Sequence, residues 1–136
     1  MRMSEYERIR IEIDAKLKEK LQLQSLSLGE NLTDIAGRAI DTAHFIELKR
    51  IKKFFVFAGG VPLSIPGEPR RHLSYIRAFS CLVNKSTAVD FIYLWQRFPS
   101  FSKGEVFGRC VDCLELIQSA YDRGDELRLV SATGKV

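Results

Sequence analysis

The sequence predicts an α+β, mostly helical fold in which two copies of a β-α-α unit pair within one chain and share one core. The first observation is a repeat: residues 35–41 are IAGRAID and residues 106–112 are VFGRCVD, 71 positions later in a chain of 136 residues. The second is that a short apolar run follows each copy, FFVF in the first half and ELRLVS in the second. One short strand and two helices cannot bury their own apolar faces, so the repeat predicts pairing of the two units.

The first unit opens with a strand. In RIRIEID, Arg8, Arg10 and Glu12 alternate with three isoleucines, Ile9, Ile11 and Ile13. A period of two is typical of a half-buried strand with one charged face. The sequence therefore predicts a two-faced strand over residues 8–13.

Two helices are expected after this strand. Asp14 stands at an N-cap position before the helix-forming segment 15–28, and Gly29 is expected to end that helix. Asn31 or Thr33 is expected to cap the second helix. The expected apolar stripe of the first helix consists of Leu17, Leu21 and Leu28, broadened by Leu23 and Leu26.

Residues 58–71 are expected to link unit 1 (1–57) to unit 2 (72–136), because they hold three of the nine glycines and three of the four prolines. The second unit repeats the order of the first: a strand over 76–83, a cap at Asn84 or Ser86, a helix that Pro99 ends, and a last helix that begins at Ser100 or Ser102. A short strand is expected at the C-terminal side of each unit. The two units are expected to share one core.

The composition is that of an ordinary globular protein, with 46% hydrophobic and 28% charged residues. The net charge of +4 is too small to establish a nucleic-acid partner by itself. No apolar run approaches the roughly 20 residues that span a bilayer, so no membrane association is expected. Three cysteines without a secretion signal favour reduced thiols and a cytoplasmic location.

The segment RIRIEIDAKLKEKL…GENLTDIAGRAI resembles the ribbon-helix-helix family of DNA-binding repressors. The resemblance covers residues 7–48 closely and residues 76–120 less closely. It implies that two strands pair into an antiparallel ribbon that enters the major groove of double-stranded DNA, above a core of four helices. It further implies base contacts by Arg8, Arg10, Glu12, Arg77 and Ser80, and backbone contacts by Asn31, Thr33, Ser102, Lys103, Lys52 and Lys53.

The chemistry of these residues suits those roles. An arginine fork matches the acceptor pair of guanine, and a carboxylate can accept from cytosine. Free N–H groups at a helix N-terminus favour a phosphate. The alternatives are that RIRIEID is an edge strand with a solvated charged face and that Lys16, Lys18 and Lys20 form a solvated helix face. The cluster Lys49, Arg50, Lys52 and Lys53 could serve either electrostatic contact with DNA or solubility.

The second strand departs from the family pattern, because RAFSCLV carries a single charge. Two registers are open, one that pairs Val83 with Ile13 and one that pairs Leu82 with Ile11, and a one-residue slip exchanges the faces. Arg77 and Ser80 lie on opposite faces, so only one of them can face DNA. The second unit could also be purely structural.

No catalytic set is visible in the sequence, so no enzyme and no cofactor are expected. Cys110 and Cys113 form a CxxC within a helix without a second pair, which favours packing over a zinc site. His44 and His72 are expected at the surface or in the linker. Glycine within a helix is unfavourable, so the repeated Gly37 and Gly108 predict close helix packing.

The preferred function is sequence-specific DNA binding as a transcriptional repressor or a regulator of a plasmid or mobile element. Pseudo-dimers of this kind could assemble side by side on DNA. The alternatives are a protein-interaction module such as an antitoxin, with an unidentified protein partner, and an accessory DNA-binding protein of conjugation, to which the tandem layout is similar.

Overall fold

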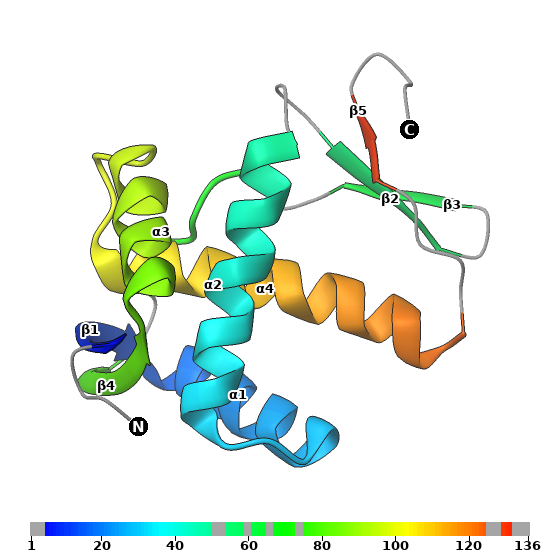
Figure 1. The fold of residues 1–136 in the computed structure, drawn as a ribbon. Helices are drawn as coiled ribbons and strands as arrows, with labels where there is room; N and C mark the ends of the chain where they lie inside the picture. Colours follow the sequence, from blue (N-terminus) through cyan, green and yellow to red (C-terminus); the bar gives the residue numbers. More distant parts are fainter. Residues whose placement is uncertain are drawn as a thin grey trace.

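A computed structural model of the chain describes residues 5–49, 54–58, 61–64, 67–72, 75–124 and 129–131. The fold is α+β and mostly helical, and its main body repeats the order strand, helix, helix (Figure 1). The first set is β1 (Tyr6–Asp14), α1 (Ala15–Leu28) and α2 (Leu32–Lys49). The second is β4 (Ile76–Asn84), α3 (Lys85–Gln96) and α4 (Lys103–Asp122).

Local sequence signals set the helix ends of the first set. The Asp14 carboxylate accepts a hydrogen bond from the backbone N–H of Leu17 at 2.8 Å and so caps α1. Gly29 ends α1 with a φ of 67°, a left-handed conformation that glycine adopts without strain. Asn31, and not Thr33, caps α2 by accepting from the Asp34 N–H at 2.8 Å.

The buried face of α1 is narrower than the sequence predicts. Leu17 and Leu21 are buried, but Leu23 and Leu26 are 60% and 81% exposed. The residue that continues the buried stripe is Gln24, at 9% exposure. A spacing of four and then three residues places 17, 21 and 24 on one helical face, whereas 23 and 26 project away from it.

The helix ends of the second set follow the same logic. Asn84 precedes α3 at the N-cap position without a side-chain cap bond, and α3 ends at Gln96, before Pro99. Ser102 caps α4 and forms a reciprocal capping box with Glu105. Gly124, with a φ of 74°, follows the end of α4.

β1 and β4 form a two-stranded antiparallel sheet, hereafter the ribbon. Its register pairs Ile9 with Cys81 and Ile11 with Phe79, so neither register considered from the sequence is present. The Val83–Ile13 alternative nevertheless gave the correct buried face, because Phe79, Cys81 and Val83 are buried together with the isoleucines of β1. A shift of one residue would have exposed this apolar face, so burial excludes such a shift.

One hydrophobic core combines the two halves of the chain. Its largest fully buried side chains come from α2 (Ile35 and Ile40), α3 (Phe91 and Leu94) and α4 (Val106, Phe107 and Val111), together with Ile13, Leu21, Cys81 and Cys110. Phe107 stacks on Phe79 of the ribbon with ring centroids 5.8 Å apart. The ribbon is thus held against the helices by its apolar face.

The expectation that Gly37 and Gly108 mark close packing is wrong, because both positions have room for a methyl group. A Cβ on Gly37 would lie 3.9 Å from Val83 Cγ1, and one on Gly108 would lie 3.4 Å from Leu17 Cδ2. These are ordinary contact distances. The close approach is at Gly104, where a Cβ would lie 1.6 Å from the carbonyl oxygen of Glu12.

A second sheet lies at the other end of the molecule from the ribbon (Figure 1). It consists of β2 (Phe54–Ala58), β3 (Val61–Ser64) and β5 (Leu129–Ser131), in the order β3-β2-β5. The predicted linker therefore contains a strand. Pro62 is compatible with it because β3 is an edge strand, where a missing N–H is tolerated.

Among the described residues, no helix has the length and apolar character to cross a membrane.

Candidate nucleic-acid interface

The outward face of the ribbon carries the charged residues of β1. Arg8, Arg10 and Glu12 are exposed, and their cross-strand partners on β4 are Leu82, Ser80 and Ala78. Residues directly opposite each other in an antiparallel pair share a face. Of the two candidates on β4, Ser80 therefore lies with the arginines.

Arg77 does not join this face. It lies opposite Ile13, and so belongs to the face of the ribbon that packs against the helices. Because the position is at the end of β4, its side chain is exposed, and its guanidinium lies 5.2 Å from the ring centroid of Tyr75. Arg77 is thus placed apart from the candidate base-contacting residues.

The two arginines of the outward face are available to a ligand. Neither Arg8 nor Arg10 has an ion-pair partner within the described part of the chain. Exposed guanidinium groups that no internal carboxylate neutralises keep all five donors for an external acceptor. Glu12 beside them adds an acceptor.

The N-terminus of α2 borders one end of the ribbon. A shallow hollow there is lined by Thr33 and Asp34 of α2 and by Tyr6, Leu82 and Asn84 of the two strands. Asn31 caps this helix end by accepting from the Asp34 N–H, and the helix dipole there favours anions. Thr33 therefore lies beside the ribbon, and Asn31 stands at the N-cap position of the same helix end.

The N-terminus of α4 borders the other end and is built differently. The hollow there is lined by Arg10, Glu12 and Ala78 of the ribbon and by Ser102 and Lys103. The Lys103 ammonium lies 4.8 Å from the ring centroid of Trp95, a cation–π contact that holds it over α3.

Glu105 occupies the first turn of α4. Its carboxylate accepts from the backbone N–H groups of Ser102 at 2.9 Å and His72 at 3.0 Å, and lies 3.2 Å from Arg71 Nη1. Burial opposes ionisation of this carboxyl, but these hydrogen bonds and the nearby guanidinium outweigh it and lower the pKa of Glu105. The carboxylate of this first-turn residue is thus held by protein groups.

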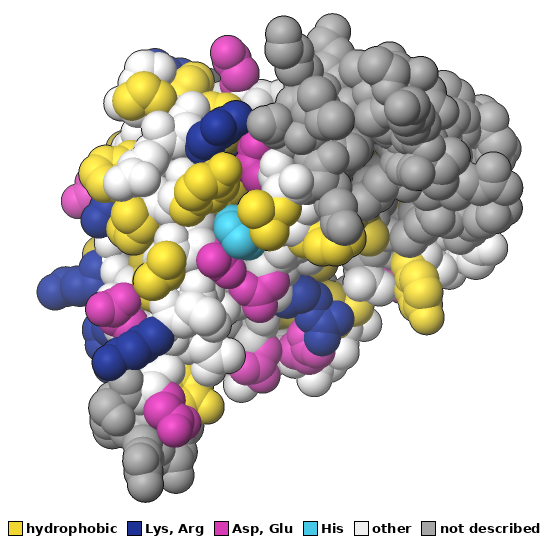
Figure 2. Space-filling model, turned by 45° about the horizontal axis from the view of Figure 1, so that its top comes forward, with side chains coloured by type: hydrophobic (Ala, Val, Ile, Leu, Met, Phe, Trp, Pro, Cys, Tyr) yellow, Lys and Arg dark blue, Asp and Glu magenta, His cyan; other side chains and the backbone are white. Residues whose placement is uncertain are grey.

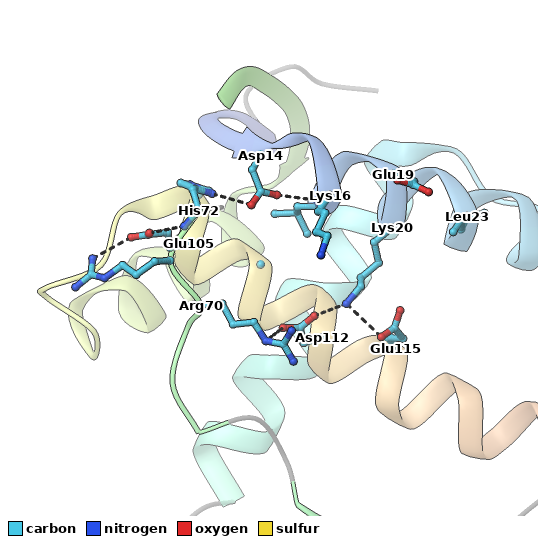
Figure 3. Close-up of a pocket in the computed structure, with 14 residues that line it drawn as sticks. Asp14, Lys16, Glu19, Lys20, Leu23, Arg70, His72, Glu105, Asp112 and Glu115 are labelled. Atoms are coloured by element: carbon cyan, nitrogen blue, oxygen red, sulfur yellow. Dashed lines mark hydrogen bonds and ion pairs between the residues drawn. The ribbon is translucent and has the colours of Figure 1, made fainter. Parts of the chain in front are cut away.

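Residues 70–72 form a strap across α1 and α4 (Figure 3). Arg71 also donates to the Ser100 carbonyl at 2.7 Å, and its guanidinium lies 4.1 Å from the Phe101 ring centroid. The imidazole of His72 lies 3.7 Å from the Asp14 carboxylate, and Arg70 lies 4.0 Å from Asp112. Arg70 and Arg71 are the last residues of the predicted linker, 58–71, and His72 is the first residue of the predicted second unit.

A cavity of about 370 Å³ is lined by residues of the strap, α1 and α4. On its wall, Lys20 bridges Asp112 at 2.7 Å and Glu115 at 3.2 Å (Figure 3). Burial disfavours the charged form of Lys20, but the hydrogen bond to Asp112 and the two carboxylates outweigh it and raise its pKa. The charges of this wall neutralise one another and tie the two helices together.

His44 and His72, expected at the surface or in the linker, are both largely covered by other residues. Their side chains are only 19% and 13% exposed, and each faces a carboxylate: Asp90 for His44 and Asp14 for His72. The sequence signal was weak, because each carboxylate lies on a different element from its histidine.

The cysteines fit a packing role. Cys81, Cys110 and Cys113 are free and buried. Burial raises the pKa of Cys110, and it raises the pKa values of Cys81 and Cys113 to about 11. No cluster of three or more His, Cys, Asp or Glu that could hold a metal occurs among the described residues.

Lys52 and Lys53, expected to contact the DNA backbone, lie outside the described residues. Over the described part of the face in Figure 2, side chains of both charges are interspersed with hydrophobic ones. On the described part of this face no patch of one charge supports a nucleic-acid ligand, and the case for one depends on the arrangement of particular residues. Comparisons with protein-family models, with curated proteins and with solved structures found no match.

Proposed function

We propose that this chain is a sequence-specific double-stranded DNA-binding protein of the ribbon-helix-helix type. In this proposal β1–α1–α2 and β4–α3–α4 are the two units of a tandem pseudo-dimer. The protein would act in the cytoplasm as a transcriptional repressor or as a regulator of a plasmid or mobile element. The ribbon enters the major groove, which admits a two-stranded ribbon by size.

One observation carries the proposal. The pairing of β1 with β4 buries the isoleucines and leaves Arg8, Arg10, Glu12 and Ser80 together on an exposed face. Arginine and carboxylate side chains on one rigid ribbon match the acceptors and donors of base edges.

The helix ends support the same geometry. The N-termini of α2 and α4 border opposite ends of the ribbon, at the two hollows described above. In a ribbon docked in the major groove, the phosphates on either side of the groove would lie toward these ends. Contacts there would fix position, while the ribbon would select sequence.

The test begins with selection of bound duplexes from a random library and then compares single variants on the selected site. Replacing Arg8 or Arg10 with Ala should cost roughly 1–3 kcal/mol of binding free energy there, with a smaller loss on unrelated DNA. Arg77→Ala is the matched control, because Arg77 belongs to the same ribbon but not to the outward face. It should leave the preference for the selected site nearly unchanged.

A second comparison separates base contacts from electrostatics. Replacing Lys52 and Lys53 together should weaken binding to all duplexes and reduce its dependence on salt, because phosphate contacts release counterions without distinguishing bases. If removal of both ribbon arginines leaves DNA affinity intact in a folded protein, the proposal is wrong. The interaction-module alternative, such as an antitoxin, would then be favoured.

A further inference from the structure

We propose that the chain binds a non-palindromic DNA site in one orientation, because the two ends of the ribbon's outward face carry different chemistry. This inference rests on the proposed DNA-binding function and adds the class of site that is bound.

The register locates the centre of the ribbon. β1 and β4 correspond with an offset of 70 positions, Tyr6 to Ile76 and Asp14 to Asn84. Arg10 is paired with Ser80, which is also its counterpart under this offset, so the midpoint of the ribbon is the Arg10–Ser80 pair. A symmetric ribbon would carry the same side chain at both positions of this pair.

The two ends differ more strongly than the centre. Arg8 is opposite Leu82, whereas Glu12 is opposite Ala78. One end therefore presents a guanidinium beside a branched alkyl group, and the other presents a carboxylate beside a methyl group. All three charges of the outward face come from β1.

Each end would prefer a different base. Arginine pairs with the O6 and N7 acceptors of guanine, a carboxylate accepts from the N4 amino group of cytosine, and alkyl groups contact the methyl group of thymine. The half-site beneath Arg8 and the half-site beneath Glu12 should consequently have different sequences. An inverted repeat would place at least one of its halves against the wrong end.

The helix N-termini differ in the same way. At the Arg8 end, α2 is capped by the neutral Asn31 side chain, and Asp34 is exposed. At the Glu12 end, the counterpart of Asp34 is Glu105, which is buried and held by Ser102, His72 and Arg71. A phosphate beside α4 would meet this fixed carboxylate, so the backbone contacts at the two ends cannot be equivalent.

Orientation can be measured with a DNA-cleaving iron chelate attached to one introduced cysteine. Lys16 and Ser86 are counterparts under the same offset; both are exposed, and each stands two residues after the end of its strand, Lys16 after Asp14 and Ser86 after Asn84. The variants Lys16→Cys and Ser86→Cys thus place the chelate at opposite ends of the ribbon. The three native cysteines are buried, which makes the new thiol the reactive one.

On the selected site, each variant should cleave one flank at least roughly tenfold more than the other, within the 5- to 150-fold preference that one good base contact gives. The two variants should cleave opposite flanks. If one variant folds poorly, the other still gives the flank ratio. Equal cleavage of both flanks, or selection of an inverted repeat, would overturn the inference while leaving DNA binding intact. If the unlabelled protein retains no selected duplex, the proposed function itself fails, and the inference fails with it.

Discussion

Replacing Gly104 with alanine should destabilise the protein strongly, although alanine is the better helix former. Gly104 lies in the first turn of α4 and is buried against the backbone of β1. An added Cβ would lie 1.6 Å from the carbonyl oxygen of Glu12 and 2.7 Å from its carbonyl carbon. Because both atoms are backbone, no side-chain rotation can relieve the clash.

The magnitude follows from the distances. To reach an ordinary contact distance, α4 and β1 would have to separate by roughly 2 Å, which would strain the packing of Phe107 on Phe79. Overpacking of a core typically costs about 1–3 kcal/mol, and a backbone clash belongs at the upper end of that range. The helix propensity of alanine returns about 1 kcal/mol at most. The expected net loss of unfolding free energy is about 2 kcal/mol.

Urea denaturation followed by far-UV circular dichroism measures this loss. Gly108→Ala, four residues further along the same helix, is the matched control. Its Cβ would meet only Leu17 Cδ2 at 3.4 Å, so the substitution should be neutral or stabilise by up to about 1 kcal/mol. If both variants are equally stable, the close approach of α4 to β1 is wrong.

Three further predictions concern stability and assembly. Both polar atoms of the Gln24 side chain are buried without a hydrogen-bond partner within the described residues, so Gln24→Leu should raise the unfolding free energy by about 1–2 kcal/mol; a loss in the same urea assay would contradict this. The lowered folded-state pKa of Glu105 means that its contribution to stability is present above its ordinary pKa of 4.5 and is lost as the pH falls through the folded value. Glu105→Gln should therefore weaken the acid dependence of stability below about pH 4.5, and an unchanged acid profile would contradict it. Because the partner of β1 is in the same chain, light scattering should find a monomer in dilute solution, and an obligate dimer would rule out pairing within one chain.

Much of the main body could be predicted because its signals are local. Alternation over residues 8–13 fixed the two faces of β1, Asp14 marked the start of α1, and Gly29 marked its end. Each signal consists of a few neighbouring residues that directly restrict the local backbone conformation. The repeat then predicted the second strand and the two helices that follow it.

The ribbon register and the Gly104 contact could not be predicted in this way. The register depends on how β4 fits over the helices, and several offsets bury the same apolar face. Gly104 approaches Glu12 across more than 90 positions of sequence, and nothing adjacent to Gly104 in the chain indicates it. Such contacts arise only when α4 docks on β1.

The strap shows a different limit. Its composition favours an irregular linker, yet Arg71 and His72 make specific contacts with Glu105 and Asp14. One signal was present in the sequence, because Ser102 followed three residues later by Glu105 is the pattern of a capping box. The partners of that glutamate outside its own helix leave no local pattern.

The buried and the outward faces of the ribbon differ in how closely β1 and β4 match each other. Under the offset of 70 positions, the buried isoleucines Ile9, Ile11 and Ile13 correspond to Phe79, Cys81 and Val83, and all six side chains are at most 9% exposed. Packing thus imposes the same apolar character on both strands. The outward positions share no such character, since the three charged residues of β1 correspond to alanine, serine and leucine on β4. Two identical chains could not differ in this way, whereas two units within one chain can, because a substitution in one strand leaves the other unchanged. The charged face of β1 is therefore not a requirement of pairing, and the proposed recognition of a non-palindromic DNA site would account for it.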